Sequence, residues 1–242
     1  NWRILALVWA VIPLINGFYF IKVPIAPLTA EGEQIMLKVA LSPVSMEGAY
    51  KNMQAELQGW EFEDVAAEAD KLWDEELRKI EVETKDTDAL KIFYSALYHS
   101  MIAPSEFCDV DGAYRGADGK THGNPYYTTH TTFSLWDTYR AEHPLLNLIK
   151  PRHGADMAES MIRIQQQSVL KLLPIWYLMA NEAWCMSGYH AVSVLSDVAK
   201  KIGIKDKKAM LKAMEETANN KWVEGLSDYI KHGYVFYDRC GT

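Results

Sequence analysis

One acid in the sequence, Glu182, lies in a segment crowded with aromatic and sulfur-containing side chains. The segment covers residues 173–190. Its aromatic and sulfur-containing residues are Trp176, Tyr177, Met179, Trp184, Cys185, Met186 and Tyr189. Apolar surroundings make the ionised form of a carboxyl group costly, so a glutamate here is a candidate proton donor. Asn181 is a good helix N-cap, which predicts that Glu182 lies in the first turn of a helix over 182–200. An ordinary capped helix, whose macrodipole favours an acid in the first turn, is the competing interpretation.

A second group of polar and aromatic residues falls on one predicted helical turn, in the run Ser134-Leu135-Trp136-Asp137-Thr138-Tyr139-Arg140. Trp136 offers a flat apolar face, and Asp137 can accept hydrogen bonds from hydroxyl groups. Those are the contacts that sugar binding needs. An ion pair between Asp137 and Arg140, three positions apart, is the alternative interpretation.

The sequence contains no metal-binding motif with a characteristic spacing. Asp109-Val110-Asp111-Gly112 resembles the opening of a calcium loop, but Lys120 stands at the twelfth position, where an EF-hand needs a bidentate acid. The two aspartates before Gly112 are therefore predicted to form a turn. Three histidines are far apart in the sequence and are predicted to be isolated and hydrogen-bonded rather than metal ligands. They are His122, His130 and His190.

The composition is that of a globular protein. The chain has 242 residues, of which 49% are hydrophobic and 12% aromatic, enough for the core of one large domain or two small ones. A formal net charge of -7 argues against nucleic-acid binding, and the lysines between Lys200 and Lys212 are interrupted by Asp206, as on a solvated helix face. The three cysteines form neither a disulfide framework nor a zinc motif and are predicted to be buried free thiols. They are Cys108, Cys185 and Cys240.

The hydrophobic periodicity predicts a mainly helical chain. Helices are expected over 46–57, 62–80, 86–101, 134–142, 151–167, 182–200, 205–218 and 223–231, with Gly233 just after the last of them. A single strand is predicted over 34–42, where alternate residues from Ile35 to Leu41 are large and apolar. The stretch 104–132 is expected to be a long functional loop, because its aromatic side chains argue against disorder.

The start of the sequence resembles a signal peptide. Arg3 is followed by an apolar run to Ile15, whose length suits the hydrophobic region of a signal, and this predicts export. Pro13 and Gly17 interrupt the apolar character, so a full membrane span is disfavoured, and any membrane contact would be through this signal or anchor. A buried core segment is the alternative interpretation of residues 1–21.

Four segments of the sequence resemble four segments that occur in the same order in glycoside hydrolase family 92. The members of this family are calcium-dependent, inverting, exo-acting α-mannosidases. The four segments are Phe93 to His99 followed by Pro104, Asp109 to Gly116, Tyr126 to Arg140, and Leu173 to His190. The likeness covers roughly residues 33–240. It implies a mainly α fold, with part of an (α/α)6 barrel (a helical toroid) preceded by a remnant of a β-sandwich domain.

The resemblance also implies a division of the chain into three parts. Residues 1–45 would hold the apolar N-terminal segment and the β-strand remnant of the N-terminal sandwich. Residues 46–81 would form a helical linker, and residues 82–242 the first part of the (α/α)6 catalytic domain.

Roles for individual residues follow from the same resemblance. Glu182 matches the general acid of the family. Trp136 and Asp137 would contact mannose in the −1 subsite, and Arg115 and His190 would support the site. A calcium ion is the implied cofactor, and the implied substrate is a mannose-containing glycan, with terminal mannose of the α-1,2-linked type in N-glycans as the target. The implied location is exported, whether periplasmic, cell-surface or secreted.

The general base of the family belongs to a Gly-Asn-Asp-Asp segment, which does not occur in this sequence before Thr242. The chain is therefore expected to be a partial one that carries the acid, lacks the base and is inactive alone. The calcium ligands are not transferred, because the sequence does not show which residues would supply six to eight oxygen atoms.

Two other classes of function stay open on the sequence. The first is a non-catalytic helical module that binds carbohydrate or a protein through residues 104–132. The second is another enzyme of the helical-toroid type, such as a polysaccharide lyase or a sugar phosphorylase. An unsaturated product or a requirement for phosphate would be the sign of that second class.

Overall fold

The computed structural model describes residues 37–123, 126–223 and 225–237. The predicted signal segment, the first part of the predicted strand and Cys240 lie outside the described residues. The chain divides into two compact units. Of the described residues, the first unit contains 37–98, 107–115 and 121–123, and the second contains 99–106, 116–120 and those from Tyr126 onward.

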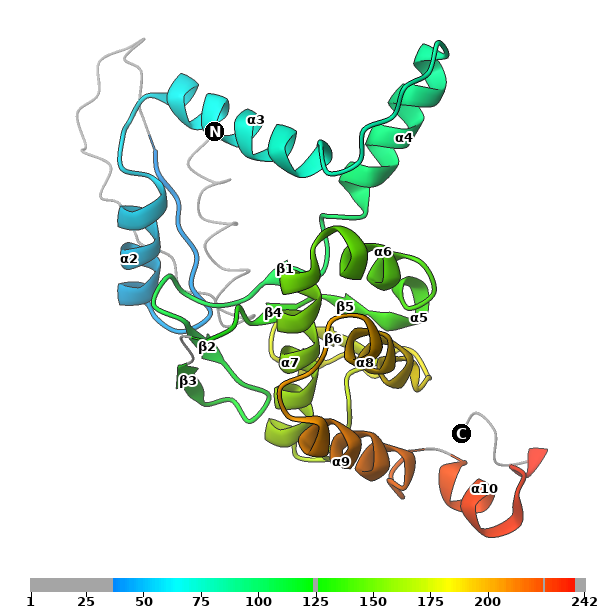
Figure 1. The fold of residues 1–242 in the computed structure, drawn as a ribbon. Coiled ribbons are helices and arrows are strands. Elements are labelled where there is room, and N and C mark those ends of the chain that lie inside the picture. Colours follow the sequence, from blue (N-terminus) through cyan, green and yellow to red (C-terminus); the bar gives the residue numbers. More distant parts are fainter. Residues whose placement is uncertain (1–36, 124–125, 224, 238–242) are drawn as a thin grey trace. The chain divides into compact units, whose positions relative to one another are not determined.

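The described part of the first unit consists of helices and one hairpin (Figure 1). The elements are α2 (Met46–Glu56), α3 (Phe62–Leu77), α4 (Thr87–His99) and the antiparallel strands β2 (Ala113–Arg115) and β3 (Thr121–Gly123). Side-chain caps begin two of the helices. Ser45 Oγ accepts a hydrogen bond from the N–H of Gly48 at 3.0 Å, and Asp86 Oδ1 accepts one from the N–H of Ala89 at 3.0 Å. Local sequence therefore sets the starts of α2 and α4.

The strand predicted over 34–42 is wrong for the part that the structure describes, whereas the sandwich remnant to which it was assigned stays a prediction. Residues 37–42 form no strand, and the alternating Leu37, Val39 and Leu41 are at least half exposed. Alternation of apolar residues produces a strand only when a neighbouring strand pairs with it and a core covers one face. No described strand pairs with this segment.

A buried aspartate organises polar side chains inside the first unit. Asp109 is 3% exposed and accepts hydrogen bonds from Ser42 Oγ at 2.8 Å and from Asn52 Nδ2 at 2.9 Å. Asn52 Oδ1 in turn accepts a hydrogen bond from the N–H of Val110 at 2.9 Å. The N–H of Gly112 donates to the carbonyl of Asp109 at 2.8 Å, which is the turn that the sequence predicts here. This motif therefore has a structural role.

Helix α7 is the centre of the second unit and packs against α6, α8 and α9 (Figure 1). The helices of this unit are α5 (Leu135–Thr138), α6 (Glu142–Ile149), α7 (Pro151–Gln167), α8 (His190–Lys201), α9 (Lys207–Ala218) and α10 (Leu226–His232). The core between them is made of buried apolar side chains that include Phe133, Leu135, Leu146, Met157, Met161, Ile162, Val194, Leu195 and Val198. The bounds of α7 are those predicted from periodicity, and Gly233 follows α10 with φ 79°, as predicted.

Short strands replace part of the predicted loop and part of a predicted helix. Inside the stretch 104–132, β1 (Ser105–Glu106) pairs antiparallel with β4 (His130–Thr131). In a second sheet, β6 lies between β5 and β7. These strands are β5 (Phe133–Ser134), β6 (Trp176–Leu178) and β7 (Asn181–Glu182). Asn181 and Glu182 thus belong to a strand, and the helix predicted from 182 begins only at His190.

A tight turn explains why the helix prediction fails at Glu182. Met179 and Ala180 have φ values of 47° and 67°, so both central residues of the β6–β7 turn lie in the left-handed region. Two-residue turns of this kind match the twist of the strands that they join. Asn181 pairs with Leu178 across the hairpin instead of capping a helix. Capping propensity is local, whereas this hairpin also pairs with β5, which is distant in the sequence.

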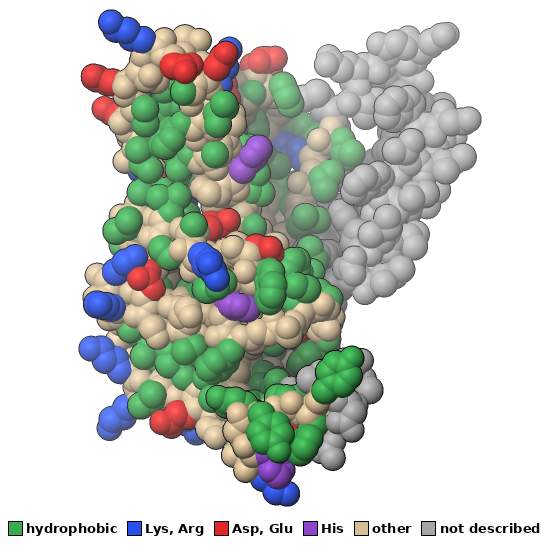
Figure 2. All heavy atoms as spheres, turned by 90° about the vertical axis from the view of Figure 1, so that its right-hand side faces the viewer, with side chains coloured by type: hydrophobic (Ala, Val, Ile, Leu, Met, Phe, Trp, Pro, Cys, Tyr) green, Lys and Arg blue, Asp and Glu red, His purple; other side chains and the backbone are tan. Residues whose placement is uncertain are grey.

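The described chain is mainly helical, as predicted. The closed (α/α)6 barrel and the domain bounds at 45 and 81 stay predictions. None of the described helices combines the length and apolar character needed to cross a membrane. Hydrophobic side chains are interspersed with charged ones on the face drawn in Figure 2, which is ordinary for a protein surface.

Candidate active site

A three-stranded sheet in the second unit positions Glu182. In its register Phe133 lies opposite Tyr177, and Tyr177 lies opposite Glu182. Residues that face each other across neighbouring strands project to the same side of a sheet. Because Phe133 and Tyr177 are buried, this side is the inner one, and Glu182 is half-buried at its edge.

Two backbone groups hold the Glu182 carboxyl group in place. Its Oε2 accepts a hydrogen bond from the N–H of Ile175 at 2.9 Å, and its Oε1 accepts one from the N–H of Trp176 at 2.8 Å. The N–H of Ala183 donates to the carbonyl of Trp176 at 3.0 Å, so the residues on either side are tied as well. Glu182 is therefore oriented by backbone atoms at the start of β6 and of the residue before it.

Glu182 lines a cavity of about 240 Å³ in the second unit. The other lining residues are Ala117, Ile164, Ser168, Val169, Leu170, Leu172, Leu173, Pro174, Ile175, Tyr177, Ala180, Asn181 and Trp184. Glu182 is the carboxylic acid of a lining whose other members are apolar or neutral. Trp136, Asp137 and His190 do not line this cavity.

The aromatic side chains expected around Glu182 do not all line its cavity or bury the acid. Trp184 lines the cavity but is 59% exposed. The hydroxyl of Tyr189 donates to the carbonyl of Met214 at 2.5 Å, away from the acid. Cys185 is exposed, so the prediction of a buried thiol is wrong there, because it follows the hairpin in an open segment rather than in a buried helix.

Three residues close to Glu182 in the sequence have unfavourable backbone conformations. Besides Met179 and Ala180 in the turn, Trp184 has a positive φ of 56°. Non-glycine residues rarely adopt such values, and they persist only where the surrounding structure holds them. One such contact is the hydrogen bond from the N–H of Met179 to Thr131 Oγ1 at 2.7 Å. Strain of this kind is common at functional sites.

The structure brings two of the predicted sugar-binding residues together. The ring centroids of Trp136 and His190 are 5.5 Å apart in an edge-to-face arrangement, and Tyr139 contacts His190 at 4.5 Å. Gly188 makes room for this contact, because a Cβ at that position would lie 2.3 Å from the His190 ring. Asp137 and Trp136 are both exposed.

Two further expectations concern an ion pair between Asp137 and Arg140 and the supporting role of Arg115. Arg140 Nε donates to the hydroxyl of Tyr139 at 2.7 Å, and within the described chain no ion pair joins Arg140 to Asp137. Arg115 is half-buried on β2 of the first unit, opposite Thr121. Its predicted role therefore rests on motif position alone.

A further acid, Glu142, was not singled out by the sequence. It is the first residue of α6, and its Oε1 is buried without a hydrogen-bond partner. Burial, followed by the negative charge of Asp137, raises the pKa of Glu142 to about 7 from its ordinary value of 4.5. A half-buried acid at the end of a predicted helix carries no local sequence signal, which explains why it was missed.

Replacing Glu142 by glutamine should increase the stability of the folded chain at alkaline pH. Because the folded state holds this proton more tightly, the stabilisation that the proton provides is complete below pH 4.5 and is lost as the pH rises through about 7. Partial exposure to solvent limits the effect to about 1–2 kcal/mol. The measurement is the urea midpoint of Glu142→Gln and of the natural chain at pH 4.5 and pH 8. The exposed Glu215→Gln serves as control, and an equal pH dependence in all three proteins would contradict the assignment.

Not all of the histidines that were predicted to be isolated are isolated in the structure. His122 stacks on Tyr114 with ring centroids 5.5 Å apart, but His130 Nε2 lies 3.1 Å from Nε2 of His153. Burial, followed by the nearby charge of His153, lowers the pKa of His130 to about 3, so its ring is neutral near pH 7. His153 lies on α7, distant in sequence from His130. No short motif contains both residues, so the sequence did not predict this pair.

Comparison with known proteins gives consistent results. A family model described as the glycosyl hydrolase family 92 catalytic domain matches residues 48–241. A solved family GH92 α-mannosidase from Bacteroides thetaiotaomicron is 42% identical with a TM-score of 0.77, and the match covers 83% of this chain and 27% of that one. The same mannosidase has also been solved in complex with mannoimidazole. A GH92 inverting mannosidase from Bacteroides thetaiotaomicron VPI-5482 is 30% identical with a TM-score of 0.75, covering 82% of this chain and 28% of that one.

A more distant relative is described as an uncharacterized secreted glycosidase of Arthroderma benhamiae. It is 28% identical over 111 residues, which are 44% of this chain and 13% of the relative. The chain thus spans about a quarter of the length of the solved mannosidases and less of this relative.

Proposed function

The chain belongs to glycosyl hydrolase family 92, and on that premise we propose that it carries the acid catalyst of an exo-acting, inverting α-mannosidase. Its substrate would be the terminal mannose of glycans, with the α-1,2 linkage of N-glycans as the preferred type. The names of the two solved relatives support a mannoside substrate, and one of them is described as inverting. The description of the fungal relative as secreted supports an exported location.

Glu182 is the general acid in this proposal. The proton of its carboxyl group passes to the glycosidic oxygen as the bond from that oxygen to C1 of mannose breaks and the bonding electrons move to the oxygen. A water molecule attacks C1 from the opposite face and gives its proton to a second carboxylate, about 6.5–9.5 Å from the acid in inverting enzymes. The observation that carries this assignment is the placement of Glu182, fixed by two backbone N–H groups at the wall of an otherwise uncharged cavity.

Trp136, Asp137, His190 and Arg115 are proposed to bind the sugar. The Trp136 ring is 48% exposed and can lie against the apolar face of mannose, while the exposed Asp137 carboxylate accepts hydrogen bonds from its hydroxyl groups. His190 supports the Trp136 ring through their edge-to-face contact. Arg115 is included on the position of its motif.

Calcium is the cofactor that family membership suggests, but the group of metal-ligating side chains found among the described residues does not fit it. The group of His, Cys, Asp and Glu side chains that could share an ion in the described chain contains two histidines and one exposed glutamate. Calcium takes six to eight oxygen ligands and does not favour imidazole nitrogen. No step of the proposed reaction is therefore assigned to calcium.

The stereochemistry of the product tests the proposed function. The full-length protein, incubated with an aryl α-mannoside and followed by proton NMR, should release β-mannose first, because water attacks the face opposite the leaving group. Initial release of α-mannose would contradict an inverting enzyme. An unsaturated product would instead indicate a lyase, and a requirement for phosphate would indicate a phosphorylase.

A further inference from the structure

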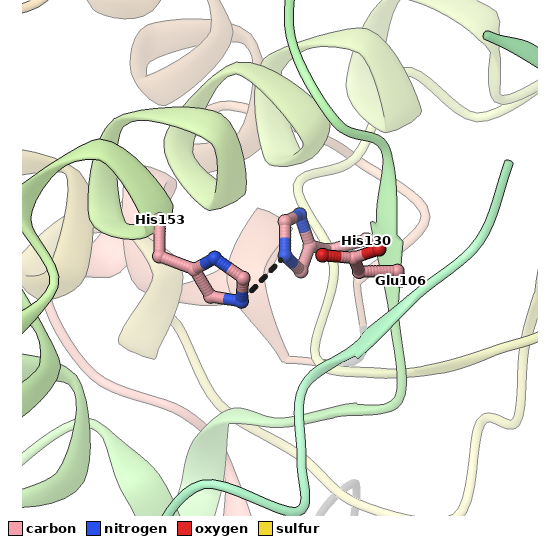
Figure 3. A group of neighbouring side chains, drawn as sticks. All are labelled: Glu106, His130 and His153. Atoms are coloured by element: carbon pink, nitrogen blue, oxygen red, sulfur yellow. Dashed lines mark hydrogen bonds between the residues drawn. The ribbon is translucent and has the colours of Figure 1, made fainter. Parts of the chain in front are cut away.

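Three side chains from separate elements of the second unit converge near one point (Figure 3). Glu106 comes from β1, His130 from β4 and His153 from α7. One potential ligand atom from each lies within 4.8 Å of the others, and the two Nε2 atoms are 3.1 Å apart. Glu106 and His130 are direct partners in the β1–β4 register, so their side chains project to the same side. The convergence therefore follows from strand pairing and from the packing of α7 on β4.

Backbone contacts orient the His130 ring for a ligand at Nε2. Its Nδ1 lies 2.8 Å from the carbonyl of Thr128, which requires the proton to be on Nδ1 and leaves the lone pair on Nε2. The N–H of His130 donates to Ser160 Oγ at 3.0 Å, which fixes the strand to α7. His130 is fully buried, so its ring has little freedom. A second ring nitrogen bound to a carbonyl is the usual support of a metal-binding histidine.

The donor atoms select the kind of ion. Two imidazole nitrogens and one carboxylate suit zinc and related divalent transition metals, whereas calcium and magnesium prefer oxygen. Around zinc, two nitrogens at 2.0–2.1 Å in a tetrahedron are about 3.3–3.4 Å apart. The 3.1 Å between the two Nε2 atoms is close to that spacing. Glu106 is exposed, so one of the three ligand side chains is in contact with solvent.

We propose that Glu106, His130 and His153 form a binding site for one divalent transition metal ion of the zinc type. The ion takes the place of the proton shared between the two Nε2 atoms, and water completes its coordination. It links β1 and β4 to α7, and so stabilises the strand that leads directly into β5 of the candidate active site. This site is independent of the assignment of Glu182.

Metal binding can be measured with cobalt, which reports its own coordination. The full-length protein, stripped of metal with a chelator, is titrated with Co²⁺ and followed by visible absorption, then with Zn²⁺ to displace it. We expect one equivalent of Co²⁺ to give the absorption of a tetrahedral site and Zn²⁺ to abolish it. Zinc should also raise the melting temperature, because it binds only the folded state.

Two variants and a control separate this site from other metal binding. Glu106→Gln alters an exposed residue and His153→Gln a half-buried one, so both should fold. Each should weaken binding at least about a hundredfold, because losing a direct ligand costs more than the 10–100-fold loss typical of an outer-shell partner. His232→Gln, at an exposed histidine of α10, should bind as the natural protein does. Equal binding by all variants, or no cobalt absorption at millimolar Co²⁺, would overturn the proposal and leave a simple hydrogen bond between the histidines.

Discussion

Glu182→Gln should slow the hydrolysis of an alkyl α-mannoside by the full-length protein by about 10²–10⁴-fold. Glutamine keeps the size of the side chain but has no acidic proton for the leaving oxygen. An α-mannoside with a dinitrophenyl leaving group needs no such proton, because the phenolate departs unassisted. The loss of rate on that substrate should therefore be much smaller. The measurement is kcat on both substrates for both proteins.

The matched control for this experiment is Glu159→Gln. Glu159 is a half-buried glutamate of α7 that pairs with Arg163 at 2.7 Å, and it does not line the Glu182 cavity. Its replacement should leave both rates near those of the natural protein. An equal loss on both substrates in Glu182→Gln would mean that the change disturbs the hairpin rather than proton donation. No loss on either would remove Glu182 from the reaction.

The elements that the sequence predicts well are those whose signals lie within them. Helix α7 combines Pro151 at its first position with a regular apolar stripe, and its bounds are those predicted. The start of α4 is set by Asp86, whose carboxylate accepts N–H groups of its first turn, and the end of α10 by Gly233. Each of these signals acts within one turn of the helix, so it predicts where a helix begins or ends without reference to distant residues.

The elements that the sequence predicts poorly depend on distant partners. Strands β6 and β7 have only three and two residues, and the pairing of β6 with β5 fixes this hairpin although some 40 residues separate β5 from β6. A turn built on Met179 and Ala180 has none of the glycine or asparagine that marks such turns. The local signal of Asn181 therefore pointed to a helix that does not form.

The candidate site shows the same division between local and distant signals. Glu182 and Trp136 became candidates through their own residue types and those of their neighbours in sequence, and their roles stay predictions. The contact between Trp136 and His190, and the pair His130 and His153, arise from folding and have no common motif. Contacts of this kind cannot be predicted from spacing in the sequence.

Asp109→Ala should lower the free energy of local opening in the first unit by about 2–4 kcal/mol. The change leaves the hydroxyl of Ser42 and one hydrogen of the Asn52 amide without their acceptor, and both residues are buried. An unsatisfied buried donor costs about 1–3 kcal/mol. Hydrogen exchange by mass spectrometry measures the effect, which should be concentrated in peptides that cover 41–53 and 107–114.

Asp111→Ala is the matched control, because Asp111 is exposed two positions away and its ion pair with Lys51 lies in solvent. It removes the acceptor of the N–H of Ala113, at 3.1 Å, but should leave exchange in the peptide that covers 41–53 almost unchanged. Gly48→Ala offers an independent test, since a Cβ there would lie 2.1 Å from Asp109 Oδ2 and must displace that carboxyl group. It should therefore deprotect the same peptides as Asp109→Ala. If Asp109→Ala and Asp111→Ala behave alike, the buried hydrogen bonds do not hold this unit together, and the motif would need a role other than a structural one.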